Sequence, residues 1–125
     1  MLDHTGINVS DYERSRDFYA KALAPLGHSL LMEPMPGIGG FGGSDSKPGF
    51  WITDLREPVT TNVHIAFSVP DRDTVDTFHA AALEAGGTDN GAPGIREIYH
   101  PQYYGAYVLD PDGNNVEAVC HRSPG

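Results

Sequence analysis

The chain has 125 residues, with eight Lys and Arg against 17 Asp and Glu and a formal net charge of −9. This charge argues against nucleic acid and anionic membranes as partners, because both are bound through clustered cationic side chains. The apolar runs are far shorter than the ~20 residues of a membrane-spanning helix, and no signal-peptide pattern begins the chain. We therefore expect a cytoplasmic protein with one domain over residues 1–125.

An internal repeat divides this domain into two modules, approximately residues 1–59 and 60–125. The segment from His4 to Gly27 matches the segment from His64 to Gly87 at one constant offset. The identical pairs are His4/His64, Val9/Val69, Asp11/Asp71, Phe18/Phe78, Ala20/Ala80, Ala22/Ala82, Leu23/Leu83 and Gly27/Gly87. Self-similarity of this kind is typical of a repeated architectural unit.

The first module begins with a strand that carries a histidine. Strand side chains alternate between two faces, so His4 lies opposite Ile7 and Val9. Ser10 and Glu13 have the spacing of a capping box and predict the start of an amphipathic helix. Three further strand segments follow, at residues 28–35, in short pieces within the glycine-rich stretch after it, and at 49–53.

The second module repeats this order. Alternation again places the histidine, His64, opposite apolar residues, here Ile65 and Phe67. A helix is predicted over 71–85 and a loop over 88–94, with strands near 95–99, 103–110 and 114–121. Between the last two strands, Asp-Pro-Asp-Gly at 110–113 has the composition of a hairpin turn.

These elements predict an α+β fold made of two βαβββ modules. If each helix covers the apolar face of its strands, the helices lie outside a cup-shaped, partly closed mixed sheet. His4 and His64 then point to the concave side. If an approximate internal two-fold relates the modules, the two histidines face each other across the cup.

The chain resembles the vicinal oxygen chelate superfamily, which includes glyoxalase I, bleomycin-resistance proteins and extradiol dioxygenases. The resemblance lies in the paired modules, in Val-Ser-Asp after the first histidine, in Val-His-Ile-Ala-Phe around the second, and above all in Leu-Asp-Pro-Asp-Gly-Asn-Asn-Val-Glu-Ala-Val at 109–119. It implies that His4, His64 and Glu117 are metal ligands. Two imidazoles and one carboxylate suit a divalent Fe, Mn, Ni, Co or Zn ion and leave positions open for substrate.

Two further residues are candidates for catalysis. Alternation in the strand before the Asp-Pro-Asp-Gly turn puts Tyr107 on the cup side, and the resemblance implies contact with a metal-bound substrate. Core packing remains the alternative for Tyr107. His100 precedes Pro101 and is predicted to lie over the mouth of the cup as an acid, a base or a lid residue.

The reaction is less defined than the site. Glyoxalase I takes a further ligand from the last strand of the first module, but residues 49–53, around Trp51, offer no carboxylate, amide or imidazole. We expect a metal-dependent small-molecule enzyme of the glyoxalase or dioxygenase type. The alternative is a non-catalytic, ligand-sequestering protein of the bleomycin-resistance type, with Trp51, Tyr103 and Tyr107 lining the cup. Family members often form homodimers, which leaves open whether His4 and His64 meet within one chain or across two.

Overall fold

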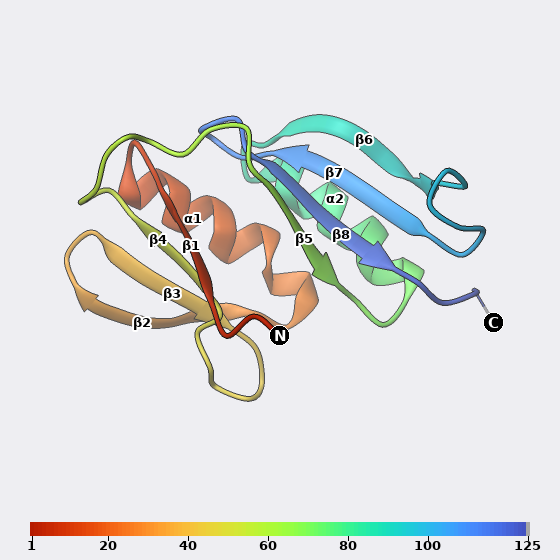
Figure 1. Cartoon of the computed structure of the whole chain (residues 1–125), viewed down its shortest axis with the longest axis horizontal. Helices are drawn as coiled ribbons and strands as arrows, with labels where there is room; N and C mark the ends of the chain where they lie inside the picture. Colours follow the sequence, from red (N-terminus) through yellow and green to blue (C-terminus); the bar gives the residue numbers. More distant parts are fainter. Residues whose placement is uncertain (125) are drawn as a thin grey trace.

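The computed structural model describes residues 1–124 and confirms the α+β fold with two βαβββ modules (Figure 1). Gly125, the last residue of the predicted domain, lies outside the described residues. The first module contains β1 (Thr5–Asn8), α1 (Tyr12–Ala22), the short 3₁₀ helix η1 (Ala24–Leu26), β2 (Ser29–Met35), β3 (Ile38–Gly42) and β4 (Phe50–Thr53). The second contains β5 (His64–Ser68), α2 (Arg72–Glu84), β6 (Thr88–Ile95), β7 (Tyr104–Leu109) and β8 (Asn115–Cys120).

Each module forms its own four-stranded sheet, in the orders β1-β4-β3-β2 and β5-β8-β7-β6. β1 is parallel to β4 and β5 is parallel to β8, while the other pairs are antiparallel. Figure 1 shows α1 behind the first sheet and α2 behind the second. Within residues 1–124 no strand pairing joins the two sheets, so β1 and β5 each have an edge without a strand partner. The predicted cup is therefore not closed within one chain.

The core lies between the sheets and their helices. Ile7 and Val9 on the first module and Val116 and Ala118 on the second are buried on the faces that the alternation predicted. Aromatic rings continue this core from one module into the other. The ring centroids are 4.9 Å apart for Tyr19 and Phe50 and 5.8 Å apart for Phe50 and Phe67. Edge-to-face contacts of this kind add to the stabilisation that burial supplies.

Both helices begin at repeat-equivalent aspartates. Asp11 accepts a hydrogen bond from the backbone N–H of Arg14 at 3.1 Å, and Asp71 accepts one from Thr74 at 2.8 Å. The predicted capping box at Ser10 is wrong, because the Ser10 hydroxyl instead donates to Asp112 at 2.5 Å. Asp112 belongs to the turn before β8, so this contact joins the two modules. No helix among the described residues is long and apolar enough to cross a membrane.

The strand predicted at residues 95–99 is wrong, because β6 covers Thr88–Ile95 instead. Its glycines and proline favour a loop in the sequence, but each has a place in this edge strand. Gly91 pairs with Tyr107, and a Cβ at Gly91 would lie 2.7 Å from the tyrosine ring. Pro93 is tolerated because an edge strand has backbone groups that no neighbouring strand needs.

A buried polar network holds the modules together around Asp110 and Asn114, which are 4% and 0% exposed. The Tyr19 hydroxyl on α1 donates to Asp110 at 2.5 Å. The Asn114 amide donates to Asp110 and to the carbonyl of Thr60, and its oxygen accepts from the backbone N–H of Val63 at 3.2 Å. This network therefore connects the first helix, the linker between modules and the start of β8.

Replacing Tyr19 with Phe should reduce the free energy of unfolding by about 1.5–3 kcal/mol, because it leaves a buried carboxyl group without one hydrogen-bond donor. Urea unfolding measures this loss. Tyr104→Phe is the matched control, since the Tyr104 hydroxyl donates to Asp76 at an exposed site. Its expected cost is below about 1 kcal/mol. Equal losses in the two variants would contradict a special role for the buried network.

Candidate metal site

The candidate site lies on the face of the second sheet that is turned away from α2. His64 stands at the start of β5, and Glu117 lies in the middle of the neighbouring strand β8. The His64 Nε2 atom is 2.7 Å from Oε1 of Glu117. The structure thus brings together two of the three predicted ligands, as the alternation of side chains indicated.

The two partners differ sharply in exposure. The Glu117 side chain is 0% exposed, whereas the His64 side chain is 53% exposed. Burying a carboxyl group is costly unless its oxygens have hydrogen-bond partners. His64 contacts one oxygen, and the Tyr103 hydroxyl donates to the other, Oε2. The contact therefore joins an imidazole that is open to solvent to a carboxyl group that is not.

Tyr103 is the site residue whose contact with Glu117 the sequence did not predict. It precedes β7 and reaches Glu117 across Gly105, where a Cβ would lie 3.1 Å from Glu117 Oε2 and 3.2 Å from Tyr103 Cε1. Burial, followed by the hydrogen bond to Glu117, raises the pKa of Tyr103 well above its ordinary value. In the sequence, the signal for this contact was Gly105, which comes two residues after Tyr103 and therefore lies on the same strand face.

Tyr107 lies on the cup side, as predicted. It pairs with Glu117 across β7 and β8, and its ring centroid is 6.2 Å from that of His64. Burial raises the pKa of the Tyr107 phenol, and the nearby Glu117 raises it further. The guanidinium of Arg96 lies 5.3 Å from the same ring. Tyr107 is therefore a protonated hydroxyl at neutral pH beside the His64 and Glu117 pair.

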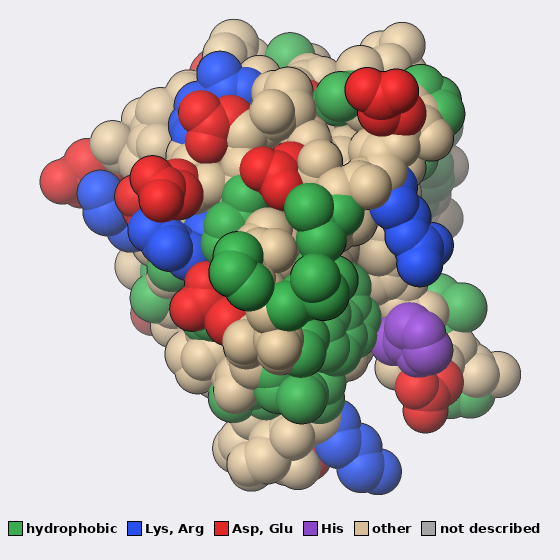
Figure 2. All heavy atoms as spheres, turned by 90° about the vertical axis from the view of Figure 1, so that its left-hand side faces the viewer, with side chains coloured by type: hydrophobic (Ala, Val, Ile, Leu, Met, Phe, Trp, Pro, Cys, Tyr) green, Lys and Arg blue, Asp and Glu red, His purple; other side chains and the backbone are tan. Residues whose placement is uncertain are grey.

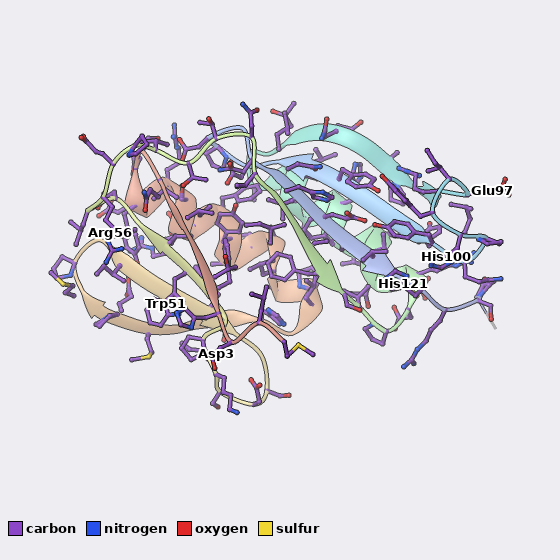
Figure 3. The ribbon with its side chains drawn as sticks, viewed as in Figure 1. Asp3, Trp51, Arg56, Glu97, His100 and His121 are labelled. Carbon is purple, nitrogen blue, oxygen red and sulfur yellow. The ribbon has the colours of Figure 1, made fainter. Side chains whose placement is uncertain are left out.

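His100 lies beyond Tyr103 rather than against Glu117. Its Nε2 is 2.9 Å from Nδ1 of His121, beside which it lies in Figure 3. Both rings pack edge-on against Tyr103. The backbone N–H of Gln102 donates to His100 Nδ1 at 3.0 Å. In neutral His100 the proton is then on Nε2, so His100 donates to His121. His100 is placed to orient Tyr103.

His4, the third predicted ligand, lies apart from the other two. Its side chain is 63% exposed, and its Nδ1 is 2.7 Å from Asp3. Figure 3 shows Asp3 beside the first sheet and His121 at the far end of the second. Among residues 1–124 no three His, Cys, Asp or Glu side chains form a group that could hold a metal ion. One chain therefore places two of the predicted ligands together and the third apart from them.

A cavity of about 630 Å³ surrounds His4 on the open face of the first sheet. It is lined by His4, Gly6, Ile38, Trp51 and Leu55, among others. The Trp51 indole N–H donates to the carbonyl of Pro48 at 2.9 Å, which fixes the ring. Figure 2 shows hydrophobic side chains gathered at this end of the molecule. The first module thus presents apolar side chains beside its histidine, together with the polar Asn8, Thr53 and Arg56.

A second cavity, of about 800 Å³, lies between the modules. Its lining includes Thr5 of β1 and the residues from His64 to Phe67 of β5. β1 and β5 are two of the four edge strands of the open sheets, and the cavity borders both of them. Phe41 and Phe50 supply apolar parts of this lining, and Asp45 and Lys47 supply charged ones.

The chain belongs to the Glyoxalase/Bleomycin resistance protein/Dioxygenase superfamily, whose profile matches residues 1–118. A glyoxalase/bleomycin resistance protein from Albidiferax ferrireducens shares 29% identity with a TM-score of 0.79, covering 96% of this chain and 97% of that one. Glyoxalase I from Zea mays shares 27% identity with a TM-score of 0.70, covering 96% of this chain and 46% of that one.

A lactoylglutathione lyase from Agrobacterium tumefaciens has the same fold, with a TM-score of 0.70 at 16% identity, covering 96% of this chain and 92% of that one. The comparison with curated proteins finds no significant match. These likenesses define the superfamily and the fold.

The raised pKa of Tyr103 gives a testable dependence of stability on pH. An unfolded tyrosine loses its proton near pH ~10, whereas folded Tyr103 keeps it to higher pH. Its contribution to stability is therefore complete below pH ~10 and declines as the pH rises further. We expect the difference in urea midpoint between the wild type and Tyr103→Phe to narrow between pH 8 and pH 11. A difference that stays constant would contradict the tight hydrogen bond to Glu117.

Proposed function

We propose that the protein is a metal-dependent enzyme in which His64 and Glu117 of one copy and His4 of a second copy hold a divalent ion. The single observation that carries this proposal is the pairing of a buried Glu117 with an exposed His64 at 2.7 Å. That pair offers an exposed nitrogen donor next to a buried oxygen donor. A third donor from elsewhere would complete a site of two imidazoles and one carboxylate.

The unpaired strand edges support a second copy as the source of His4. β1 and β5 are repeat-equivalent, and each lacks a strand neighbour on one side within residues 1–124. A two-fold axis between copies would place β1 of one beside β5 of the other, twice over, because such interfaces are self-complementary. His4 directly precedes β1 and His64 begins β5, so this arrangement would bring them together.

The donor set fits Fe, Mn, Ni, Co or Zn in the divalent state. When bound, such an ion would act as a Lewis acid toward a substrate that chelates it through vicinal oxygens. β4, which contains Trp51, has no acidic side chain to add a further ligand. This departure from glyoxalase I weakens isomerisation through a glutamate base and leaves positions open for substrate.

The remaining side chains have roles that follow from their contacts. Tyr107 would donate a hydrogen bond to a substrate oxygen, since its raised pKa keeps the phenol protonated. Tyr103 would hold Glu117 in place, and His100 would hold Tyr103. The apolar side chains in the cavity beside Trp51 would contact the hydrocarbon part of the substrate.

The second candidate is a ligand-sequestering protein of the bleomycin-resistance type. The apolar side chains of the cavity beside Trp51 favour it, because they can bind a hydrophobic ligand without any metal. Undiminished ligand affinity after exhaustive chelation would favour this function over the enzyme.

Replacing His64 with Ala should abolish stoichiometric binding of Zn(II) or Ni(II), because it removes one of two adjacent donors. Elemental analysis after dialysis, together with calorimetric titration, measures the change. His79→Ala is the matched control, since His79 also pairs with an acidic side chain, Asp89, at 3.0 Å. The control should keep the metal content of the wild type. Unchanged metal content in His64→Ala would refute the proposed site.

A mixing experiment separates a site between copies from a site within one. His4→Ala and Glu117→Ala should each fail to bind metal alone. After the two variants are mixed and allowed to exchange subunits, half of the dimers are mixed, and one of their two sites has all native ligands. About a quarter of the total sites should then recover metal. No recovery, despite exchange verified by native mass spectrometry, would contradict the shared site.

A further inference from the structure

We infer that the substrate carries a carboxylate besides its chelating oxygens, and that Arg96 binds this carboxylate. The inference rests on the proposed function, because it names the class of substrate for the same site. Arg96 directly follows β6, and its backbone N–H donates to the carbonyl of Tyr103 at 2.8 Å. Its position is therefore tied to the residue that contacts Glu117.

Tyr107 lies between Arg96 and the proposed metal ligands. The Arg96 guanidinium is 5.3 Å from the centre of the Tyr107 ring, which is 6.2 Å from the centre of the His64 ring. All three side chains thus lie along one face of the second sheet. A ligand held at His64 and Glu117 and lying over Tyr107 would reach Arg96 with its other end.

The backbone of β6 holds the guanidinium in a fixed place. A Cβ at Gly94 would lie 2.9 Å from Nη1 of Arg96, and one at Gly91 would lie 3.3 Å from Nη2. The two glycines therefore leave the room that the guanidinium fills. Nη2 donates to the carbonyl of Ala92 at 2.6 Å. The side chain is held in advance, which reduces the entropy lost when a ligand binds.

The charge of Arg96 has no acidic partner in the part of the chain that the structure describes, where no carboxylate lies within 4.0 Å of it. A guanidinium has five N–H donors in a planar fork that matches the two oxygens of a carboxylate. The single positive charge of Arg96 balances the single negative charge of a carboxylate.

The spacing favours a ring-sized spacer between the two ends of the substrate. The centre of the Tyr107 ring is 6.2 Å from that of the His64 ring and 5.3 Å from the Arg96 guanidinium. A two-carbon acid bound at the proposed metal ligands would therefore be too short to reach Arg96. 3,4-Dihydroxybenzoate has two vicinal oxygens, a ring and a carboxylate. 4-Methylcatechol has the same chelating pair and ring but no charge, so the two molecules form a matched pair of probes.

The test is calorimetric titration of the Zn(II)-loaded protein with each probe. Arg96→Gln should lower the affinity for 3,4-dihydroxybenzoate about tenfold and change that for 4-methylcatechol by less than about twofold, as expected for loss of one charge-assisted contact. Arg96→Lys, which keeps the charge without the planar fork, should lie between the wild type and Arg96→Gln. Far-UV circular dichroism and the urea midpoint verify that the variants are folded.

Arg72→Gln is the matched control. Arg72 lies 5.0 Å from the ring of Tyr104, so it makes the same type of contact, but Tyr104 faces α2 and bonds to Asp76 there. The Arg72→Gln variant should bind both probes with the affinities of the wild type. Equal losses of 3,4-dihydroxybenzoate affinity in Arg72→Gln and Arg96→Gln would overturn the inference.

Two other results would also overturn the inference about Arg96. One is that 3,4-dihydroxybenzoate does not bind to the Zn(II)-loaded wild type. The other is that Arg96→Gln binds 3,4-dihydroxybenzoate with the same affinity as the wild type. Repeating the titrations after chelation separates this inference from the proposed function. An Arg96-dependent preference for 3,4-dihydroxybenzoate that survives without metal would support the carboxylate contact, while failure of the wild type to take up Zn(II) would refute the metal site alone.

Discussion

The buried carboxyl group of Asp110 is the constraint on which the arrangement of this protein depends. It accepts hydrogen bonds from Tyr19 on α1, from the backbone of Asp112 and from Asn114 at the entry to β8. Because Asn114 also bonds to the linker between the modules, one polar cluster fixes the first helix, the linker and the last strand together. Glu117 follows three residues later on that strand. The position of the candidate site is thus set by a cluster outside it.

The two modules have the same fold but different surfaces. The second carries the polar groups, with a buried Glu117 held by His64 and Tyr103. The first offers a cavity lined by Trp51 and other apolar side chains, with His4 also in its lining. Neither surface alone provides both a chelating centre and a place for hydrocarbon. Completion by a second copy would join one surface of each kind, along the open edges of β1 and β5.

Much of this arrangement could be predicted from the period-two alternation and the repeat. Alternation placed His64, Tyr107 and Glu117 on one face because each lies in a regular strand with clear apolar neighbours. It failed for β6, where glycines that make room for Tyr107 and Arg96 have the composition of a loop. The contact of Tyr103 with Glu117 crosses Gly105 and depends on tertiary packing. The separation of the two sheets also depends on how the modules pack against each other, and no local sequence pattern predicts that packing.

The central claim is that two copies share each metal site, and a crystal structure of the Co(II)-loaded protein tests it most directly. An anomalous difference map recorded at the cobalt absorption edge locates the ion without reference to the protein atoms. The account predicts one peak per chain, bonded to His64 and Glu117 of one copy and to His4 of the other. A peak bonded to all three residues of the same chain, or peaks away from Glu117, would contradict it.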